Sequence, residues 1–204
     1  MKLLTVIFLI ISGLATAQSL TIKKDQGGLI SLGGRTTIST FSHGEFDNTG
    51  LGLGGQFRLQ FADQVNSDWF FDYIQSDLED VAFRTDYHIG WSVIFYPTRK
   101  FEVPVRPYIL AGHCFDYTRV VDNTDRNNYM ERWSSAVQGG AGVHFNLSPR
   151  LDLSVVGQYM VHLGTDVHAD VHDGEVHFHE EKGASLEGHL LFHVGINYKI
   201  ADLW

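Results

Sequence analysis

Apolar and polar positions alternate along most of this chain. In residues 51–61, leucine or phenylalanine stands at nearly every second position, with glycine, glutamine or arginine between them. The same alternation returns in residues 82–97 and in three later segments. A period of two predicts β-strands with one apolar face, and these runs are longer than the usual strand of a soluble sheet. The predicted strands lie near residues 28–40, 50–62, 67–76, 83–96, 104–118, 131–146, 151–163 and 187–200.

The connections between these segments are of two kinds, and the two kinds alternate. Residues 62–68, 97–104 and 146–150 form short connections rich in turn formers, whereas residues 41–50, 75–80, 120–131 and the histidine-rich stretch after residue 163 form polar loops. This order predicts an all-β, antiparallel, up-and-down arrangement of eight strands with both termini at one end. Two strands have weaker patterns: residues 67–76 are short, and in residues 104–118 Arg106 and Asp116 share a face with Leu110.

The first 17 residues have the features of a secretory signal peptide. Lys2 precedes an apolar run from Leu3 to Leu14, and residues 15–17 read Ala-Thr-Ala. The apolar run is shorter than the ~20 residues that a transmembrane helix needs. We therefore expect cleavage before Gln18 and a mature, exported domain of residues 18–204 without a transmembrane helix.

Charge and cysteine content exclude some classes of function. The formal net charge of −9 argues against nucleic acid as a partner. Cys114 is the only cysteine, so the chain has no intramolecular disulfide framework. We expect Cys114 to pack as a small apolar residue, with intermolecular pairing as the less favoured possibility.

The composition of the two strand faces favours a barrel that is apolar outside. Bulky apolar side chains fill one face, and aromatic residues stand near the strand ends, as in the interfacial girdles of transmembrane barrels. These aromatic residues are Trp69, Phe71, Tyr73, Phe95, Trp133, Phe145 and Tyr198. The other face carries glycine, serine, glutamine, arginine, aspartate and histidine, which suit a narrow, filled interior.

The last strand carries a further signal. In residues 193–200, His193, Gly195, Tyr198 and Ile200 have the spacing polar, glycine, aromatic, apolar. This spacing resembles the signal by which the outer-membrane barrel assembly machinery recognises last strands. Over its mature length the chain resembles the small eight-stranded outer-membrane β-barrels of Gram-negative bacteria, of the OmpA, OmpX and OmpW types. The resemblance implies a transmembrane barrel in the cell outer membrane, with periplasmic termini, short periplasmic turns, longer outer loops and membrane lipid as a partner.

An eight-stranded barrel leaves an interior just wide enough for its own side chains, so we expect no general diffusion pore. Buried charges must pair, which predicts a polar network across the lumen. A stabilising plug is the favoured interpretation of this network, and a proton or ion pathway is the competing one. The residues predicted to point inward are Arg58, Arg84, Asp86, His88, Gln138, His144, Asp152, Gln158, His162, His189, His193, Asn197 and Lys199.

The stretch from Thr165 to Glu181 combines four histidines with six acidic residues around Asp173-Gly174. An Asp-Gly pair between two alternating runs predicts a β-hairpin with a two-residue turn. With the turn there, position 172 faces 175, 170 faces 177, 168 faces 179 and 166 faces 181. The candidate divalent-metal ligands are His168, Asp170, His172, Glu175, His177 and His179.

Imidazole and carboxylate ligands suit Zn, Cu or Ni. A first site would use His168 and His179 with Asp170 or His177, and a second would use His172 with Glu175. A solvated loop with incidental or no metal affinity and a pH-sensing hairpin are the competing hypotheses.

Catalysis is the least favoured class. Some outer-membrane barrels are hydrolases or acyltransferases, but neither a Gly-x-Ser-x-Gly elbow nor a His-Glu-x-x-His helix occurs here. Asp86 and His88 share a strand face, and we interpret them as a satisfied interior pair rather than a catalytic one. We therefore expect no enzymatic activity. Two more hypotheses stay open: a barrel that admits small hydrophobic ligands through a lateral opening, as in OmpW-type members, and a secreted soluble barrel of the lipocalin kind.

Overall fold

The structure, a computed structural model, describes residues 27–43, 46–78, 81–99, 103–164, 166–172, 175–181 and 188–203. For residues 41–43, 46–48, 166–172 and 175–181 it describes the backbone only. The expected signal peptide lies outside these ranges. No helix among the described residues has the length and hydropathy needed to cross a bilayer.

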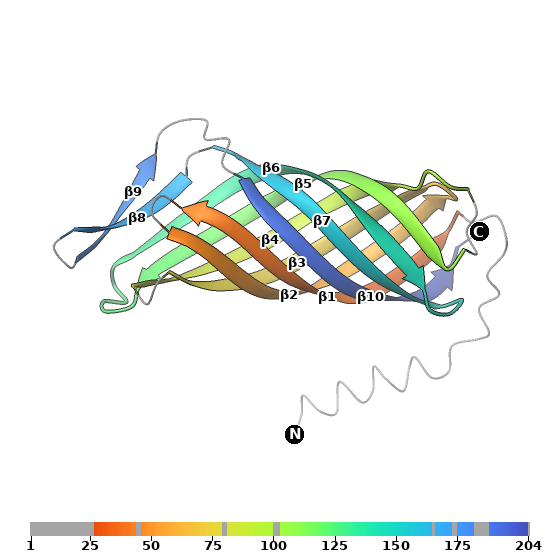
Figure 1. The fold of residues 1–204 in the computed structure, drawn as a ribbon, viewed down its shortest axis with the longest axis horizontal. Helices are drawn as coiled ribbons and strands as arrows, with labels where there is room; N and C mark the ends of the chain where they lie inside the picture. The colour runs from red at the N-terminus through yellow and green to blue at the C-terminus, as the bar shows by residue number, and fades with distance from the viewer. Residues whose placement is uncertain are drawn as a thin grey trace, which may run out of the picture.

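Eight long antiparallel strands close into one barrel, and two short strands form a separate hairpin (Figure 1). Around the barrel the order is β1-β10-β7-β6-β5-β4-β3-β2, so every strand has two hydrogen-bonded neighbours and β10 closes the sheet against β1. This confirms the predicted fold. The strands of the barrel are β1 (Leu29–His43), β2 (Phe46–Ala62), β3 (Val65–Leu78), β4 (Ala82–Phe95), β5 (Val105–Asp122), β6 (Tyr129–Asn146), β7 (Leu151–Leu163) and β10 (Gly188–Asp202); the hairpin strands are β8 (Asp166–His172) and β9 (Glu175–Glu181).

The hairpin lies at the end of the barrel opposite the C-terminus (Figure 1). We call these the hairpin end and the C-terminal end. The short connections between β2 and β3, β4 and β5, and β6 and β7 all lie at the C-terminal end, as the alternation of turns and loops predicts.

Strands extend further toward the hairpin end than the sequence predicts. Residues 41–43, 46–50 and 75–78, predicted as loops, continue β1, β2 and β3, and β5 runs on to Asp122. Only the connection from β7 to β10 is long, and β8 and β9 lie within it. The polar loops predicted at residues 41–50, 75–80 and 120–131 are therefore shorter than expected. The physical reason is that ladder hydrogen bonds between neighbouring strands stabilise a pair beyond the end of its apolar pattern.

The barrel is polar inside and apolar outside. Asp72, Arg84 and Asp116 have no exposed surface, whereas Leu53 is 69% and Trp133 is 72% exposed. A soluble barrel has the opposite distribution, because water would contact these exterior side chains. This inversion argues against a soluble, lipocalin-like barrel.

Strand β5, whose pattern was ambiguous, follows the same rule. Its inward face carries Arg106, Leu110, Cys114 and Asp116, and His113 faces outward. The apolar residues that obscured its pattern are interior ones. Cys114 has no exposed surface and packs with five other apolar residues inside the barrel, as predicted for a small apolar side chain.

Candidate functional site

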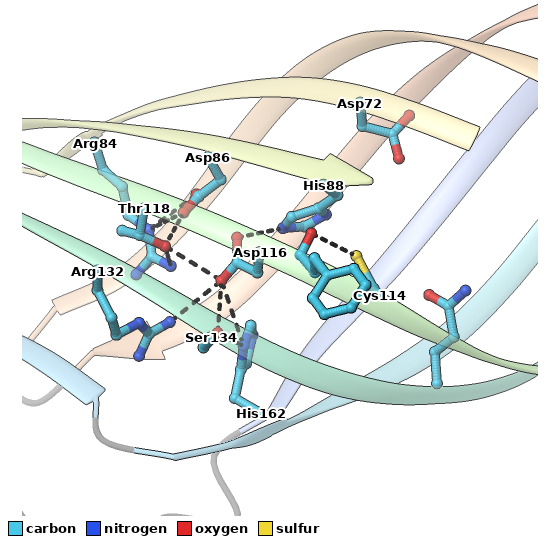
Figure 2. A network of polar contacts seen from close by, with 12 residues as sticks. Asp72, Arg84, Asp86, His88, Cys114, Asp116, Thr118, Arg132, Ser134 and His162 are labelled. Atoms are coloured by element: carbon cyan, nitrogen blue, oxygen red, sulfur yellow. Dashed lines mark hydrogen bonds and ion pairs between the residues drawn. The ribbon is translucent and has the colours of Figure 1, made fainter. Parts of the chain in front are cut away.

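Asp116 lies at the centre of a polar network in the hairpin half of the lumen (Figure 2). Its carboxylate lies 3.3 Å from His88 Nε2, 3.3 Å from an Arg132 nitrogen and 3.4 Å from His162 Nδ1. The Ser134 hydroxyl donates to the same carboxylate over 3.4 Å. One carboxylate thus joins β4, β5, β6 and β7 from inside.

A second ion pair adjoins Asp116. Arg84 donates from Nε to both oxygens of Asp86, at 3.0 and 2.9 Å. Thr118 links the two groups, since its hydroxyl lies 2.7 Å from Asp86 and 3.3 Å from Asp116 (Figure 2). The predicted pairing of Asp86 with His88 is wrong: both point inward, but Asp86 pairs with Arg84 and Thr118, and the residue directly opposite His88 is Asp116.

The middle of the lumen holds a bidentate pair between Arg35 of β1 and Asp72 of β3. The Arg35 guanidinium also lies 4.2 Å from the centre of the Phe70 ring. Thr37 and His193 are hydrogen-bonded beside it over 2.9 Å. The Arg35–Asp72 pair connects β1 with β3, which are not neighbours in the barrel, because the two side chains cross its interior, whereas Thr37 and His193 lie opposite each other on the neighbouring strands β1 and β10.

A third group fills the C-terminal half. Arg58 donates to Asp68 and to Asp152, each over 3.1 Å, and Asn197 donates to Asp152 over 2.9 Å. Near it the Tyr96 hydroxyl lies 2.8 Å from His144 Nδ1. All these groups are buried, and in each ion pair a guanidinium lies beside a carboxylate.

A small cavity lies among the side chains in the middle of the lumen. This cavity of about 20 Å³, lined by Arg35, Phe70 and His193 among others, is large enough for about one water molecule. A pocket for a small hydrophobic ligand needs at least about 300 Å³. The cavity beside Arg35 is therefore too small for such a ligand.

The sequence identified the inward-facing residues well. All thirteen residues predicted to point inward are buried. It missed Arg106, which donates to the Asp63 carbonyl oxygen, and several residues that complete the ion pairs, namely Arg35, Asp68, Asp72, Asp116 and Arg132. Asp72 could have been found, because it alternates with Trp69, Phe71 and Tyr73, which all face outward; Asp116 could not, because its strand has no clean phase.

The hairpin has the register that its Asp-Gly pair predicts. Position 166 pairs with 181, 168 with 179, 170 with 177 and 172 with 175. The turn residues 173–174 and the hairpin side chains lie outside the described residues. Among the described side chains no group of three or more histidine, cysteine, aspartate or glutamate residues could hold a metal ion. Metal binding by His168, Asp170, His172, Glu175, His177 and His179 stays a prediction.

A continuous aromatic row crosses the outside of the barrel. Tyr73, Tyr87, Tyr117 and Trp133 stand directly opposite one another on β3, β4, β5 and β6. Neighbouring ring centres lie 5.1, 5.9 and 4.9 Å apart. Tyrosine and tryptophan favour membrane–water interfaces, so this row indicates where the lipid-facing band ends toward the hairpin end.

Comparison with known proteins gives a fold and no close relative. No protein-family model and no curated protein matches this chain. Among solved structures, Neisserial surface protein A superposes with a TM-score of 0.59 at 13% sequence identity, over 87% of this chain and 99% of the other.

Two further solved structures are similar. Ail, the attachment invasion locus protein of Yersinia pestis, has a TM-score of 0.52 at 13% identity over 85% of this chain and 99% of its own. A major outer membrane protein from Thermus thermophilus has a TM-score of 0.53 at 12% identity over 83% and 98%. At this level of identity the similarity shows the fold alone.

Proposed function

We propose that this chain, which has the fold of the small eight-stranded outer-membrane barrels, sits in an outer membrane and acts through the groups that it presents at its hairpin end. The apolar exterior requires a lipid solvent, and a closed barrel leaves no backbone group unpaired in lipid. The C-terminal end, with its short connections, then faces the periplasm. Heat-modifiable migration and fractionation with the outer membrane test this placement; purely periplasmic protein would refute it.

The proposed activity is capture of a divalent metal ion by the β8–β9 hairpin. The observation that carries it is the ladder register, which places position 168 opposite 179 and position 170 opposite 177. Directly opposed residues have Cβ atoms about 4.5–5.5 Å apart, and positions two apart on a strand share a face. Histidine or acid thus occupies every position on one face of this hairpin.

Two sites follow from this spacing. His168 and His179, with Asp170 or His177, supply three ligands at bond lengths of about 2.0–2.2 Å, and His172 with Glu175 supplies a second, smaller set. Imidazole with carboxylate suits Zn, Cu and Ni. Membrane lipid and the barrel assembly machinery are the other partners that we propose.

Calorimetric titration of the refolded barrel with Zn, Cu and Ni tests the metal site. The test variant carries alanine at His168, His172, His177 and His179. The matched control is Glu180→Ala, because position 180 pairs with Val167 and belongs to the other face of the ladder. We expect roughly micromolar or tighter binding in the parent and control chains and none in the test variant. Heat that the four substitutions leave unchanged would show that the hairpin is only a solvated arm.

A further inference from the structure

One polar pair interrupts the apolar exterior of the barrel. His113 of β5 and Ser135 of β6 both face outward, and His113 Nε2 lies 2.6 Å from Ser135 Oγ. The edge of the His113 imidazole meets the Phe115 ring, with 4.9 Å between the ring centres. The neighbouring outward positions are apolar, including Trp91 and Val137, which pair directly with His113.

The position of His113 is unusual for a lipid-facing wall. Between the aromatic row and the turns at the C-terminal end, it is the one outward-facing imidazole, carboxylate, ammonium or guanidinium group on the described strands. Ionisable groups at membrane depth are costly and mark functional sites. A neutral His113 has one N–H donor and Ser135 has one O–H donor, and the contact between the two side chains uses only one of them. No second partner for either side chain occurs among the described residues, so a hydrogen-bond donor is left facing the lipid.

The depth of His113 and Ser135 in the membrane determines which part of a lipid molecule they contact. Ser135 stands opposite Phe115 in the ladder. This pair lies two residues from the Tyr117–Trp133 pair of the aromatic row, toward the C-terminal end of the barrel. Two residues span about 7 Å along a strand, or about 5 Å along the membrane normal at a tilt of roughly 40°. The aromatic row lies at the headgroup level. Ser135 is therefore at the level where the acyl esters of a lipid lie, just beneath the headgroups.

We propose that Ser135 and His113 form a nucleophile–base pair that cleaves acyl esters of outer-leaflet lipids. A hydroxyl within hydrogen-bond reach of an imidazole nitrogen is one of the two features of an activated nucleophile, the other being a third group that orients the imidazole. Ser135 Oγ attacks the ester carbonyl while its proton passes to His113 Nε2. The carbon–oxygen bond to the lipid alcohol breaks, and the alcohol leaves with that proton. Water then attacks the acyl-serine, again with His113 as base, and restores Ser135 as the fatty acid is released.

Turnover is expected to be slow. No carboxylate contacts His113 among the described residues, and loss of the orienting carboxylate in a serine hydrolase triad costs about 10⁴-fold in rate. This proposal departs from the expectation of no enzymatic activity. It rests on the membrane placement proposed above and not on metal binding.

The test uses the full refolded barrel with mixed micelles of dioleoyl phosphatidylcholine and, separately, a fluorophosphonate probe that labels activated serines. We expect fatty acid release, and labelling located on Ser135 by peptide mass spectrometry. Ser135→Ala should abolish both, and His113→Gln, which keeps a hydrogen-bonding side chain without a base, should lower both at least tenfold. The matched control is Ser134→Ala, since Ser134 points into the lumen toward His162, and it should label like the parent chain.

Two outcomes would overturn the proposal. One is a barrel with unchanged heat-modifiable migration that neither releases fatty acid nor labels at Ser135. The other is release that Ser135→Ala leaves unchanged, because the activity would then come from elsewhere. Failure of membrane placement is distinguishable, since it appears in the fractionation of the chain and not in the labelling of the refolded barrel.

Discussion

Asp116 stands directly opposite His88 in the β4–β5 ladder, and their side chains meet 3.3 Å apart where neither is exposed. The register of two strands thus brings an acid and an imidazole together without any loop or ligand. Because Arg132 and His162 reach the same carboxylate from β6 and β7, removing Asp116 affects four strands at once.

Asp116→Ala should therefore destabilise the barrel strongly. Breaking a buried charge pair by removing one partner costs about 3–5 kcal/mol, because the other charge stays buried and unpaired. Urea unfolding of the refolded barrel measures this change. The control is Glu131→Gln. The side chains of Glu131 and its partner Arg119 are 41% and 44% exposed, so this ion pair should contribute at most about 1 kcal/mol to the free energy of unfolding. Equal effects of the two substitutions would contradict the role assigned to the network.

The barrel should not conduct ions. The cavity of about 20 Å³ in its interior has room for about one water molecule, and the charged groups that span the lumen are paired. Recordings in planar bilayers should show no sustained ohmic conductance from the wild-type protein. Stable channels that scale with protein concentration would instead favour the pathway interpretation of the lumen.

Gly90 should tolerate no larger residue. A Cβ atom at this position would lie 2.6 Å from Phe70 Cζ and 2.6 Å from the His113 carbonyl oxygen. Because the Phe70 ring is held under Arg35, Gly90→Val should cost about 1–3 kcal/mol or more by overpacking. Gly139→Ala is the control, since its Cβ would meet nothing closer than 3.9 Å. The denaturant midpoints of both variants measure this difference in stability, and similar midpoints would contradict the predicted overpacking at Gly90.

Cys114 should be unreactive in the folded barrel. The side chain is fully buried in an apolar cluster with Ala136 and Met160 among its members. A hydrophilic maleimide should label it only after unfolding in urea, as intact mass shows. Rapid labelling of folded protein, or a disulfide-linked dimer on a non-reducing gel, would mean that the interior opens.

Metal affinity of the hairpin should depend on its register. Deleting Val171 shifts the part of β8 before it by one residue, and a one-residue slip moves those side chains, including His168 and Asp170, to the other face. The deletion should abolish zinc binding at the first site although its ligands are still present, while His172 stays opposite Glu175 beside the turn. Val171→Ala, which keeps the whole register, should leave both sites unchanged. Unchanged affinity in the deletion variant would mean that the ligands act without the ladder.

Much of the fold could be predicted because a barrel strand carries its own pattern. Alternation in β2, β4, β7 and β10 identifies both faces from local sequence, and Asp173-Gly174 sets the register of the hairpin over residues 166–181. Strand ends could not be predicted equally well. β1 and β3 continue into polar sequence because pairing with a neighbour stabilises them there, and no local pattern encodes that partner.

Local sequence is enough to assign most side chains to the lumen or to the lipid, since this follows from a period of two and from the polarity of each residue. Which of these side chains meet depends on the folded barrel. Asp116 joins His88 because two strands share a register, Arg35 reaches Asp72 across the closed barrel, and His113 meets Ser135 on its outer wall. Barrel closure and strand register bring distant residues into contact, and they depend on all eight strands together.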